Sequence, residues 1–359
     1  MRSAAEAGLT PAEVNAILDS SPAAFPYQLA EAWQISDALV RQLKQTISEV
    51  TATGLFDPAV KFRSRQHERA FRGLKPSARR KWLRENEYWR EVADLTYRSP
   101  CQALAVDLVE FADVALSCTI RGPLTVGFAL LRKALKDDLF ALEWIVADPE
   151  DYFQRFFSGT ALDREVRNLK APRQIEIIRA AASKTRVGEW MPAEMLHDLR
   201  FNKNSPTGLE PLWQKANHLV TTQGALTTQA ETLNFVFADD DERDELWRAF
   251  YGVVPALFFH VTQVFDAALA SFAGRAEPGH TAQLVRTLAG MTLWMRSKGT
   301  RIDLAKQRKL FERLLLRQFP KKSCERCARR VSLTLKNRHQ LFEDGRIECA
   351  GCGQVISVE

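Results

Sequence analysis

The chain has 359 residues, of which 46% are apolar and 26% are charged. This composition excludes an intrinsically disordered chain, and the length allows two domains or one large one. Glycine and proline are sparse, at 17 and 15 residues, which favours long helices over a turn-rich β fold. The first residues lack an apolar core of about 7–15 residues, so no secretory signal is expected.

The net charge of +6 is distributed unevenly along the chain. Residues 61–90 contain eleven Lys and Arg against three acids, a local charge of +8. Residues 296–330 contain thirteen against three, a local charge of +10. The remaining residues therefore carry −12, the difference between +6 and the +18 of these two segments. Positive charge concentrated in this way is suited to a polyanionic partner.

Apolar residues recur at spacings of three and four through most of the chain, which predicts α-helices. Helices are expected over residues 26–53, over 57–97 with a break at Lys75, and over 102–118 and 124–146. Shorter helices are expected over 173–185, 192–200 and 209–221, and further ones over 238–273, 279–297 and 301–318. The sequence therefore predicts a mainly α protein with an all-helical, bundle-like body over residues 1–320, with candidate subdivisions near residues 97 and 235.

The helix expected over 124–146 has an apolar stripe that predicts a central position in the body. The stripe consists of Leu124, Phe128, Leu131, Leu135, Leu139 and Leu142.

The most apolar segment, residues 252–274, is interrupted by Pro255, His260, Gln263 and Asp266. A membrane span usually needs about 20 uninterrupted apolar residues. The segment is therefore interpreted as a buried core helix, and no membrane partner is expected.

The tail contains two C-x-x-C pairs, Cys324 with Cys327 and Cys349 with Cys352, separated by 21 residues. Two such pairs form the tetrahedral thiolate set that zinc prefers. Thiols used as metal ligands, rather than in disulfides, indicate a reducing, cytoplasmic location. The other cysteines are embedded in apolar helical sequence.

Residues 331–335 and 355–358 alternate apolar and polar residues, which predicts strands, and Gly345 follows two acids in a turn signal. The spacing and the C-x-G-C-G second knuckle of residues 321–359 resemble the zinc-ribbon family. Because four thiolates complete the coordination shell, Zn²⁺ is expected to be structural, in a small β module after the helical body.

The helix expected over 301–318 and the cysteine module carry exposed cations that predict a nucleic-acid-binding surface, DNA or RNA, through contacts to phosphates. The candidate residues are Arg313, Arg317, Lys321, Lys322, Arg326, Arg329, Arg330, Lys336 and Arg338. The first basic segment adds aromatic residues that would stack on bases if they were exposed. Solvated helix faces, or a protein partner that docks on the ribbon as on a scaffold, are the alternatives.

The sequence contains no phosphate-binding glycine loop, no dinucleotide fingerprint, no H-E-x-x-H helix and no nucleophile elbow, so an enzyme is not favoured. Arg132 and His218 are weak candidates for acid–base chemistry or phosphate binding. A satisfied buried salt-bridge network, involving Lys136 and Glu143, is the favoured alternative.

The patterns LTVGFALLRKALKDDLFALEWI and LEPLWQKANHLVTT resemble uncharacterised bacterial all-helical proteins related to the HEPN superfamily. The resemblance covers about residues 25–275 and implies a helical fold. It also implies a ribonuclease, or a component of a bacterial defence or multi-protein system, as an alternative function. In that family an Arg and a His lie on one helix with four to six residues between them. This pattern is not matched, because only three residues lie between Arg63 and His67, and His218 has no arginine at the required distance upstream.

Overall fold

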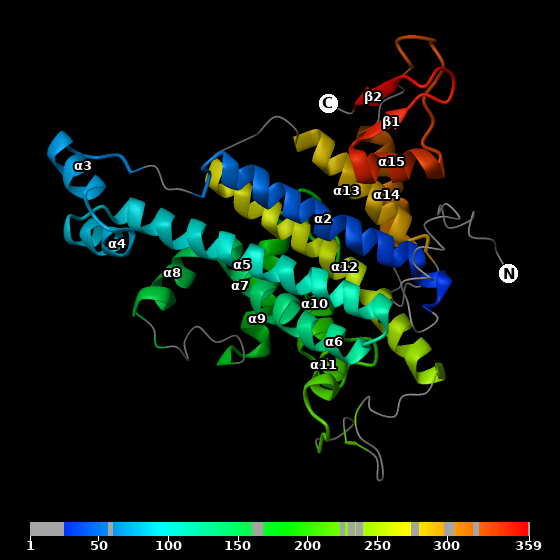
Figure 1. Cartoon of the computed structure of the whole chain (residues 1–359), viewed down its shortest axis with the longest axis horizontal. Coiled ribbons are helices and arrows are strands. Elements are labelled where there is room, and N and C mark those ends of the chain that lie inside the picture. Colours follow the sequence, from blue (N-terminus) through cyan, green and yellow to red (C-terminus); the bar gives the residue numbers. More distant parts are fainter. Residues whose placement is uncertain are drawn as a thin grey trace.

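The computed structural model describes residues 25–56, 60–158, 160, 168–222, 227–228, 234, 240–273, 280–297, 305–318 and 323–357. Within these ranges the protein is mainly helical and has one pair of short strands (Figure 1), which confirms the predicted fold class. The candidate subdivision near residue 235 lies outside the described residues.

The elements up to residue 158 are η2 (Tyr27–Leu29), α2 (Ala30–Ala52), α3 (Arg65–Arg72), α4 (Pro76–Glu85), α5 (Trp89–Arg121), α6 (Leu124–Arg132), η3 (Lys133–Asp138), α7 (Leu139–Ala147) and α8 (Pro149–Ser158). They are followed by α9 (Ala171–Ser183), α10 (Ala193–Phe201), α11 (Glu210–Asn217), α12 (Asp240–Ala273), α13 (His280–Trp294), α14 (Ala305–Gln318) and α15 (Leu335–Asp344). The strands are β1 (Arg346–Glu348) and β2 (Val355–Ser357).

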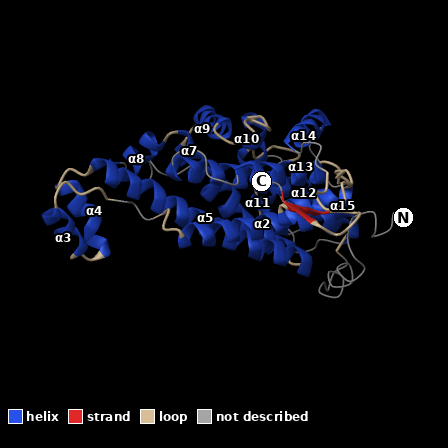
Figure 2. Cartoon of the chain, turned by 90° about the horizontal axis from the view of Figure 1, so that it is seen from above, coloured by secondary structure: helices blue, strands red, loops and turns tan. Residues whose placement is uncertain are grey.

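The long helices α2, α5 and α12 run side by side through the centre of the body (Figures 1 and 2). α12 is long and apolar enough to span a membrane by length and composition, but 83% of its most apolar window is buried inside the protein. Its neighbours are α2 on one side and α7 and α9 on another. α12 is therefore a core helix, as the sequence predicted, because side chains on several sides of it are buried.

The helix predicted over residues 124–146 forms, and every member of its apolar stripe is buried. Its middle, Lys133–Asp138, is a π-helix, which the sequence did not predict. A π-helix has more residues per turn than an α-helix. The π-helical segment therefore changes the direction in which the side chains of α7 point relative to those of α6. The carbonyl of Leu135 in this segment accepts a hydrogen bond from Arg200 on α10, at 3.3 Å.

The short helices α3 and α4 form a lobe at one end of the molecule, beyond the start of α5 (Figure 1). This lobe, residues 60–92, has an apolar cluster of its own around Leu83, Tyr88 and Val92. The aromatic rings of the first basic segment mostly pack within this cluster, at centroid distances such as 5.2 Å between Phe62 and Phe71. The rings of Phe62, Phe71, Trp82 and Tyr88 are therefore used in packing the lobe. Trp89 is 57% exposed and is the exception. Residue 97 lies inside α5, so the chain passes through that candidate subdivision as continuous helix.

The cysteine module differs from the prediction between its two cysteine pairs. The strand predicted over 331–335 is wrong: residues 331–334 have no regular structure, and α15 begins at Leu335. The Thr334 hydroxyl caps this helix by accepting the Asn337 N–H, and Gly345 ends it at a φ of 68°. β1 and β2 pair antiparallel, with Ile347 opposite Ile356, so the predicted second strand is confirmed.

The hydrophobic core continues from the helical body into this module. Leu341, Phe342 and Ile347 belong to the same apolar cluster as the residues of α2, α7 and α12. α15 packs against α13, and the Gln42 side chain on α2 donates a hydrogen bond of 2.8 Å to the Phe342 carbonyl. The module is therefore anchored to the body through α15.

Candidate metal centre and basic surface

The first cysteine pair lies on a tight turn held by backbone hydrogen bonds. The Cys324 N–H donates to the Arg329 carbonyl at 2.9 Å, and the Ala328 N–H donates to the Cys324 carbonyl at 2.8 Å. Ser323 and Arg330 form an antiparallel bridge that closes the turn. Ala328 adopts a φ of 55°, a left-handed conformation that tight turns of this kind require.

The second pair lies in the connection between β1 and β2. The Cys349 N–H donates to the Gln354 carbonyl, and the Gly353 N–H donates to the Cys349 carbonyl, both at 2.9 Å. Gly353 has a φ of 69°, which a side chain would disfavour. The hairpin thus turns the second pair of thiols toward the first.

The four thiol groups converge on one point. Their Sγ atoms all lie within 4.8 Å of one another. Across the two turns, Cys324 lies 3.5 Å from Cys352 and Cys327 lies 3.5 Å from Cys349. A tetrahedral centre with metal–sulfur bonds of about 2.3 Å places sulfur atoms about 3.8 Å apart. The four residues therefore fit a single metal ion, as the spacing predicted.

Backbone N–H groups around the second turn favour the thiolate form that a metal ligand needs. The Gly351 N–H points at the Cys349 Sγ, 3.4 Å away. Hydrogen bonds from the backbone of Gly351 and Cys352 lower the pKa of the Cys349 thiol to about 6. The second turn therefore favours the thiolate form of Cys349.

The module packs closely against α13 at Gly290. A Cβ placed on Gly290 would lie 2.4 Å from Cδ2 of Phe342 and 3.0 Å from Cε1 of Phe259. The Arg286 guanidinium donates to the carbonyls of Phe342 and Glu343, at 3.3 and 2.7 Å. A cation at the C-terminus of a helix is stabilising, so Arg286 caps α15 while it joins the helix to α13.

Six of the nine predicted nucleic-acid-binding residues are exposed, with no carboxylate partner among the described residues. These six are Arg313, Arg317, Arg326, Arg329, Arg330 and Lys336.

Two of the nine are engaged by the protein itself. Arg329 donates to the Ala350 carbonyl at 3.1 Å and so bridges the two cysteine turns. Arg338 is 12% exposed, pairs with Glu312 at 3.6 Å and donates to the Leu333 carbonyl. Both side chains therefore have structural contacts that a ligand would have to replace. Lys321 and Lys322 lie outside the described residues.

The structure does not bring Arg132 and His218 together. Arg132 lies 3.7 Å from Asp137 on the surface. His218 is exposed, just past the C-terminus of α11, and its carbonyl accepts a hydrogen bond from Asn234. Within the described part of the chain, no hydrogen bond or ion pair joins the two candidates. They do not form an acid–base pair in this structure.

A buried polar network lies instead between α7, α10 and α12. Glu143 accepts two hydrogen bonds from Arg200, at 2.8 and 2.9 Å, and lies 2.7 Å from Nε2 of His260. All three side chains are at least 99% buried. Despite desolvation, the charge of Arg200 and the hydrogen bond to His260 hold the pKa of Glu143 below its usual range. The carboxylate is fully satisfied, which matches the salt-bridge interpretation of this helix.

His260 is the member that the sequence interpretation missed. Its signal is a polar side chain inside the apolar run of α12, where Gln263 and Asp266 are polar as well. A second, partly buried pair, Lys136 with Glu210 at 2.6 Å, joins η3 to α11. These contacts connect helices that are distant in sequence.

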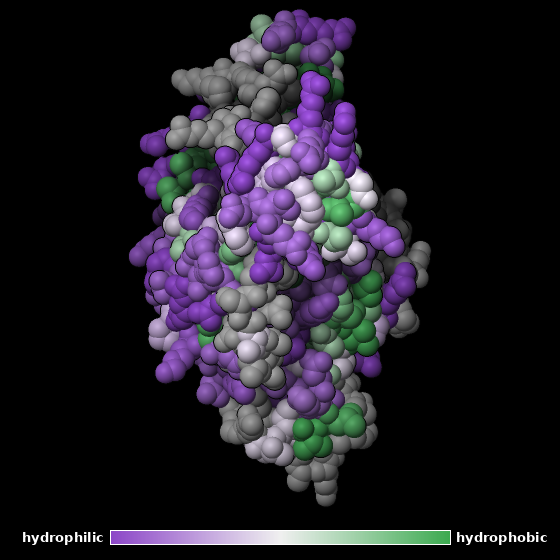
Figure 3. All heavy atoms as spheres, turned by 90° about the vertical axis from the view of Figure 1, so that its left-hand side faces the viewer, coloured by the Kyte–Doolittle hydropathy of each residue, from purple (hydrophilic) through white to green (hydrophobic). Residues whose placement is uncertain are grey.

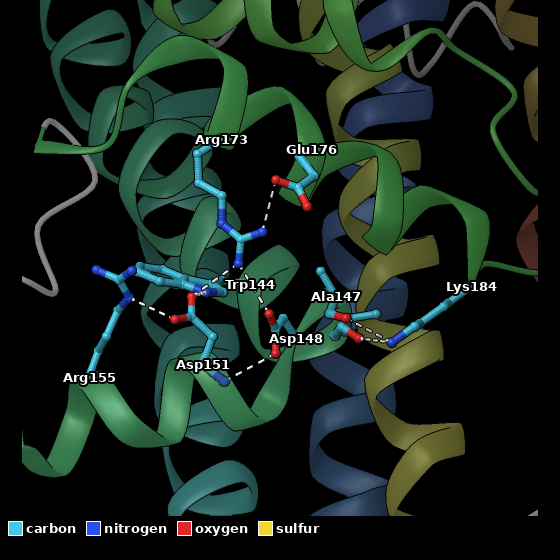
Figure 4. A network of polar contacts seen from close by, with 9 residues as sticks. Trp144, Ala147, Asp148, Asp151, Arg155, Arg173, Glu176 and Lys184 are labelled. Atoms are coloured by element: carbon cyan, nitrogen blue, oxygen red, sulfur yellow. Dashed lines mark hydrogen bonds and ion pairs between the residues drawn. The ribbon is translucent and has the colours of Figure 1, made fainter.

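A further polar network joins α7, α8 and α9 (Figure 4). Arg173 pairs with Asp148 at 3.1 Å and with Asp151 at 3.2 Å. Although desolvation opposes ionisation, hydrogen bonds from Arg155, Arg173 and Trp144 hold the pKa of Asp151 below its usual range. The network closes the α7–α8 corner and carries a structural role.

Comparisons with protein-family models, curated proteins and solved structures gave no match to this chain. The function proposed below is therefore based on the geometry of the candidate metal centre and on the charge of the exposed C-terminal cations beside it.

Proposed function

We propose that this protein is a cytoplasmic nucleic-acid-binding protein, and that a structural Zn²⁺ held by Cys324, Cys327, Cys349 and Cys352 anchors its basic C-terminal surface. The single observation that carries the proposal is the set of exposed C-terminal cations without carboxylate partners among the described residues. Outside residues 61–90 and 296–330 the chain carries a net charge of −12, so acidic side chains were available to pair with them.

The cations of α14 lie along one face of the helix. Lys306, Lys309, Arg313 and Arg317 are exposed at spacings of three, four and four residues, which places them in one stripe. The opposite face buries Phe311 and Leu315 in the core. The stripe spans about 16 Å at 1.5 Å per residue, and a nucleic-acid strand offers a phosphate about every 3.4 Å along a duplex axis.

The metal module continues this positive surface from α14. Arg326 and Arg330 lie on and beside the first cysteine turn, and Lys336 lies on α15; all three are exposed. α14 and α15 are joined by the ion pair between Glu312 and Arg338. The four converging thiols support the proposal, because a zinc ion held by four thiolates would have a closed, structural coordination shell that holds the two cysteine turns in place.

The experiment compares two double charge reversals in the full, metal-loaded chain. Arg313→Glu/Arg317→Glu changes the α14 stripe. Lys170→Glu/Lys203→Glu is the matched control, because both lysines are exposed, have no carboxylate partner among the described residues, and give the same change in net charge. Binding to fluorescent DNA and RNA is measured by anisotropy at several salt concentrations.

We expect the stripe variant to bind at least tenfold more weakly than the control, with a shallower dependence on salt, because counterion release scales with the number of phosphates neutralised. Equal affinities of the two variants would remove the α14 surface from the proposal. No binding by the unsubstituted protein at low salt would remove nucleic acid as the partner.

A further inference from the structure

The contacts that hold the lobe of α3 and α4 together lie on the side of α3 that faces the lobe. They do not involve its outer face, the side exposed to solvent. The two short helices are joined by three residues that include Gly73. The Ser64 hydroxyl caps α3 by accepting the His67 N–H. The Tyr88 hydroxyl accepts the Arg63 N–H at 2.9 Å and lies 2.9 Å from Nδ1 of His67. α3 is thereby fixed on the lobe through its inner face.

The outer face of α3 combines positive charge with small residues. The exposed residues of this face are Arg65, Gln66, Arg69, Ala70 and Gly73. Arg72 pairs with Glu68 on the same helix, whereas Arg65 and Arg69 have no carboxylate partner among the described residues. Two like charges four residues apart destabilise a helix, although the dipole of α3 favours Arg69 in its last turn.

The fold does not require glycine at position 73. Its φ of −73° lies in the ordinary right-handed region, and a Cβ there would meet only the Arg69 and Ala70 carbonyls, each at 3.6 Å. Because Ala70 and Gly73 have no bulky side chain, the surface beside the two arginines does not protrude. Another molecule can therefore come close to the backbone of α3 at this point.

We propose that the outer face of α3 binds double-stranded DNA, lying in the major groove with Arg65 and Arg69 against the phosphates. A helix with side chains is about 10–12 Å across, close to the width of the B-form major groove. The lobe stands at the end of the molecule beyond the body (Figures 1 and 2), and that end is mostly hydrophilic (Figure 3). The deep, narrow groove of A-form RNA would not admit it.

This inference rests on the proposed function only in assigning nucleic acid as the partner, because it concerns a separate surface at the other end of the chain's long axis. The two basic regions lie at opposite ends in Figures 1 and 2. The lobe would thus supply a duplex-specific contact in addition to the C-terminal one.

The test uses Arg65→Gln/Arg69→Gln in the full, metal-loaded chain, with Lys170→Gln/Lys203→Gln as the matched control. Anisotropy is measured with a fluorescent DNA duplex, with single-stranded DNA and with an RNA duplex of the same sequence, between about 50 and 200 mM salt. We expect the log–log salt slope for duplex DNA to fall by about 2, close to 0.9 for each phosphate that the variant no longer neutralises. The control should keep the original slope.

Gly73→Leu adds bulk on the same face without changing charge. It should lower the affinity for duplex DNA while the salt slope stays unchanged, and its helical content should match that of the unsubstituted protein. A slope for Arg65→Gln/Arg69→Gln equal to that of the control would overturn the inference. Equal binding of the RNA duplex would overturn the assignment to the major groove.

The outcomes separate the two proposals. Loss of affinity in Arg313→Glu/Arg317→Glu alone supports the C-terminal surface and removes the lobe. Loss in Arg65→Gln/Arg69→Gln alone supports the lobe and removes the C-terminal surface.

Discussion

Replacing Gly290 by alanine tests whether the metal module is packed onto the body as described. The added Cβ would lie 2.4 and 2.6 Å from two ring carbons of Phe342 and 3.0 Å from Phe259. Carbon atoms in contact normally lie about 3.5–4.0 Å apart. Phe342 is 1% exposed and cannot swing into solvent. Overpacking of this kind costs about 1–3 kcal/mol.

A second substitution should relieve this strain. Phe342→Leu removes the ring carbons that the new Cβ would meet, and by itself it should cost about 1–2 kcal/mol, less than a truncation to alanine. In Gly290→Ala/Phe342→Leu the two costs should not add, with a favourable coupling of about 1 kcal/mol.

The assay is urea unfolding, followed by circular dichroism and by metal release to a chromogenic chelator that reports on the module. Gly73→Ala is the matched control, because its Cβ meets only ordinary contacts at an ordinary φ. It should be neutral or stabilising by up to about 1 kcal/mol. A Gly290→Ala midpoint equal to that of the control, or strictly additive costs in the double variant, would refute the packing of α15 on α13.

Two further predictions concern buried charges. Glu143→Leu should destabilise the protein by about 3–5 kcal/mol, because Arg200 is left buried without its partner. Glu143→Leu/Arg200→Met should recover part of that loss, as measured by urea unfolding. A double variant less stable than the single variant would contradict this prediction. Burial, together with hydrogen bonding to Asp107, raises the pKa of Asp138 to about 8, so the folded state keeps a proton that the unfolded chain releases near pH 4. The stability of Asp138→Asn relative to the unsubstituted protein should therefore rise between pH 5 and pH 8, and a pH-independent difference would show that this carboxyl is not protonated in the fold.

Features that depend on local spacing were predictable from the sequence. The apolar stripe of residues 124–142 recurs at helical intervals, and all of its members are buried. The paired C-x-x-C spacing predicted four converging thiols, which the structure confirms. In both cases the signal is contained in a short stretch of chain or in a residue type with few alternative uses.

The strand predicted over residues 331–335 was wrong because a short period-two pattern is ambiguous. Val331 and Leu333 are partly buried and pack against the main core without forming a ladder. The competing signals were the cap at Thr334 and the helix end at Gly345, and these decide the local structure.

Contacts between distant helices were beyond the sequence. Glu143 meets Arg200 and His260 across 57 and 117 residues of chain. Glu143 is the only charged residue of α7, but α10 and α12 each carry several polar residues. Nothing local indicates which of them Glu143 will contact. The choice is fixed by how the helices pack, including the π-helix that reorients α7.

The proposed zinc site is tested most directly by the metal content of the purified, reduced chain, measured by native mass spectrometry together with zinc-edge X-ray absorption. We expect one zinc ion per chain with four sulfur ligands at about 2.3 Å, and loss of this ion in Cys324→Ser/Cys349→Ser. A chain that is folded but contains no metal, or a zinc ion with nitrogen or oxygen ligands, would contradict this expectation.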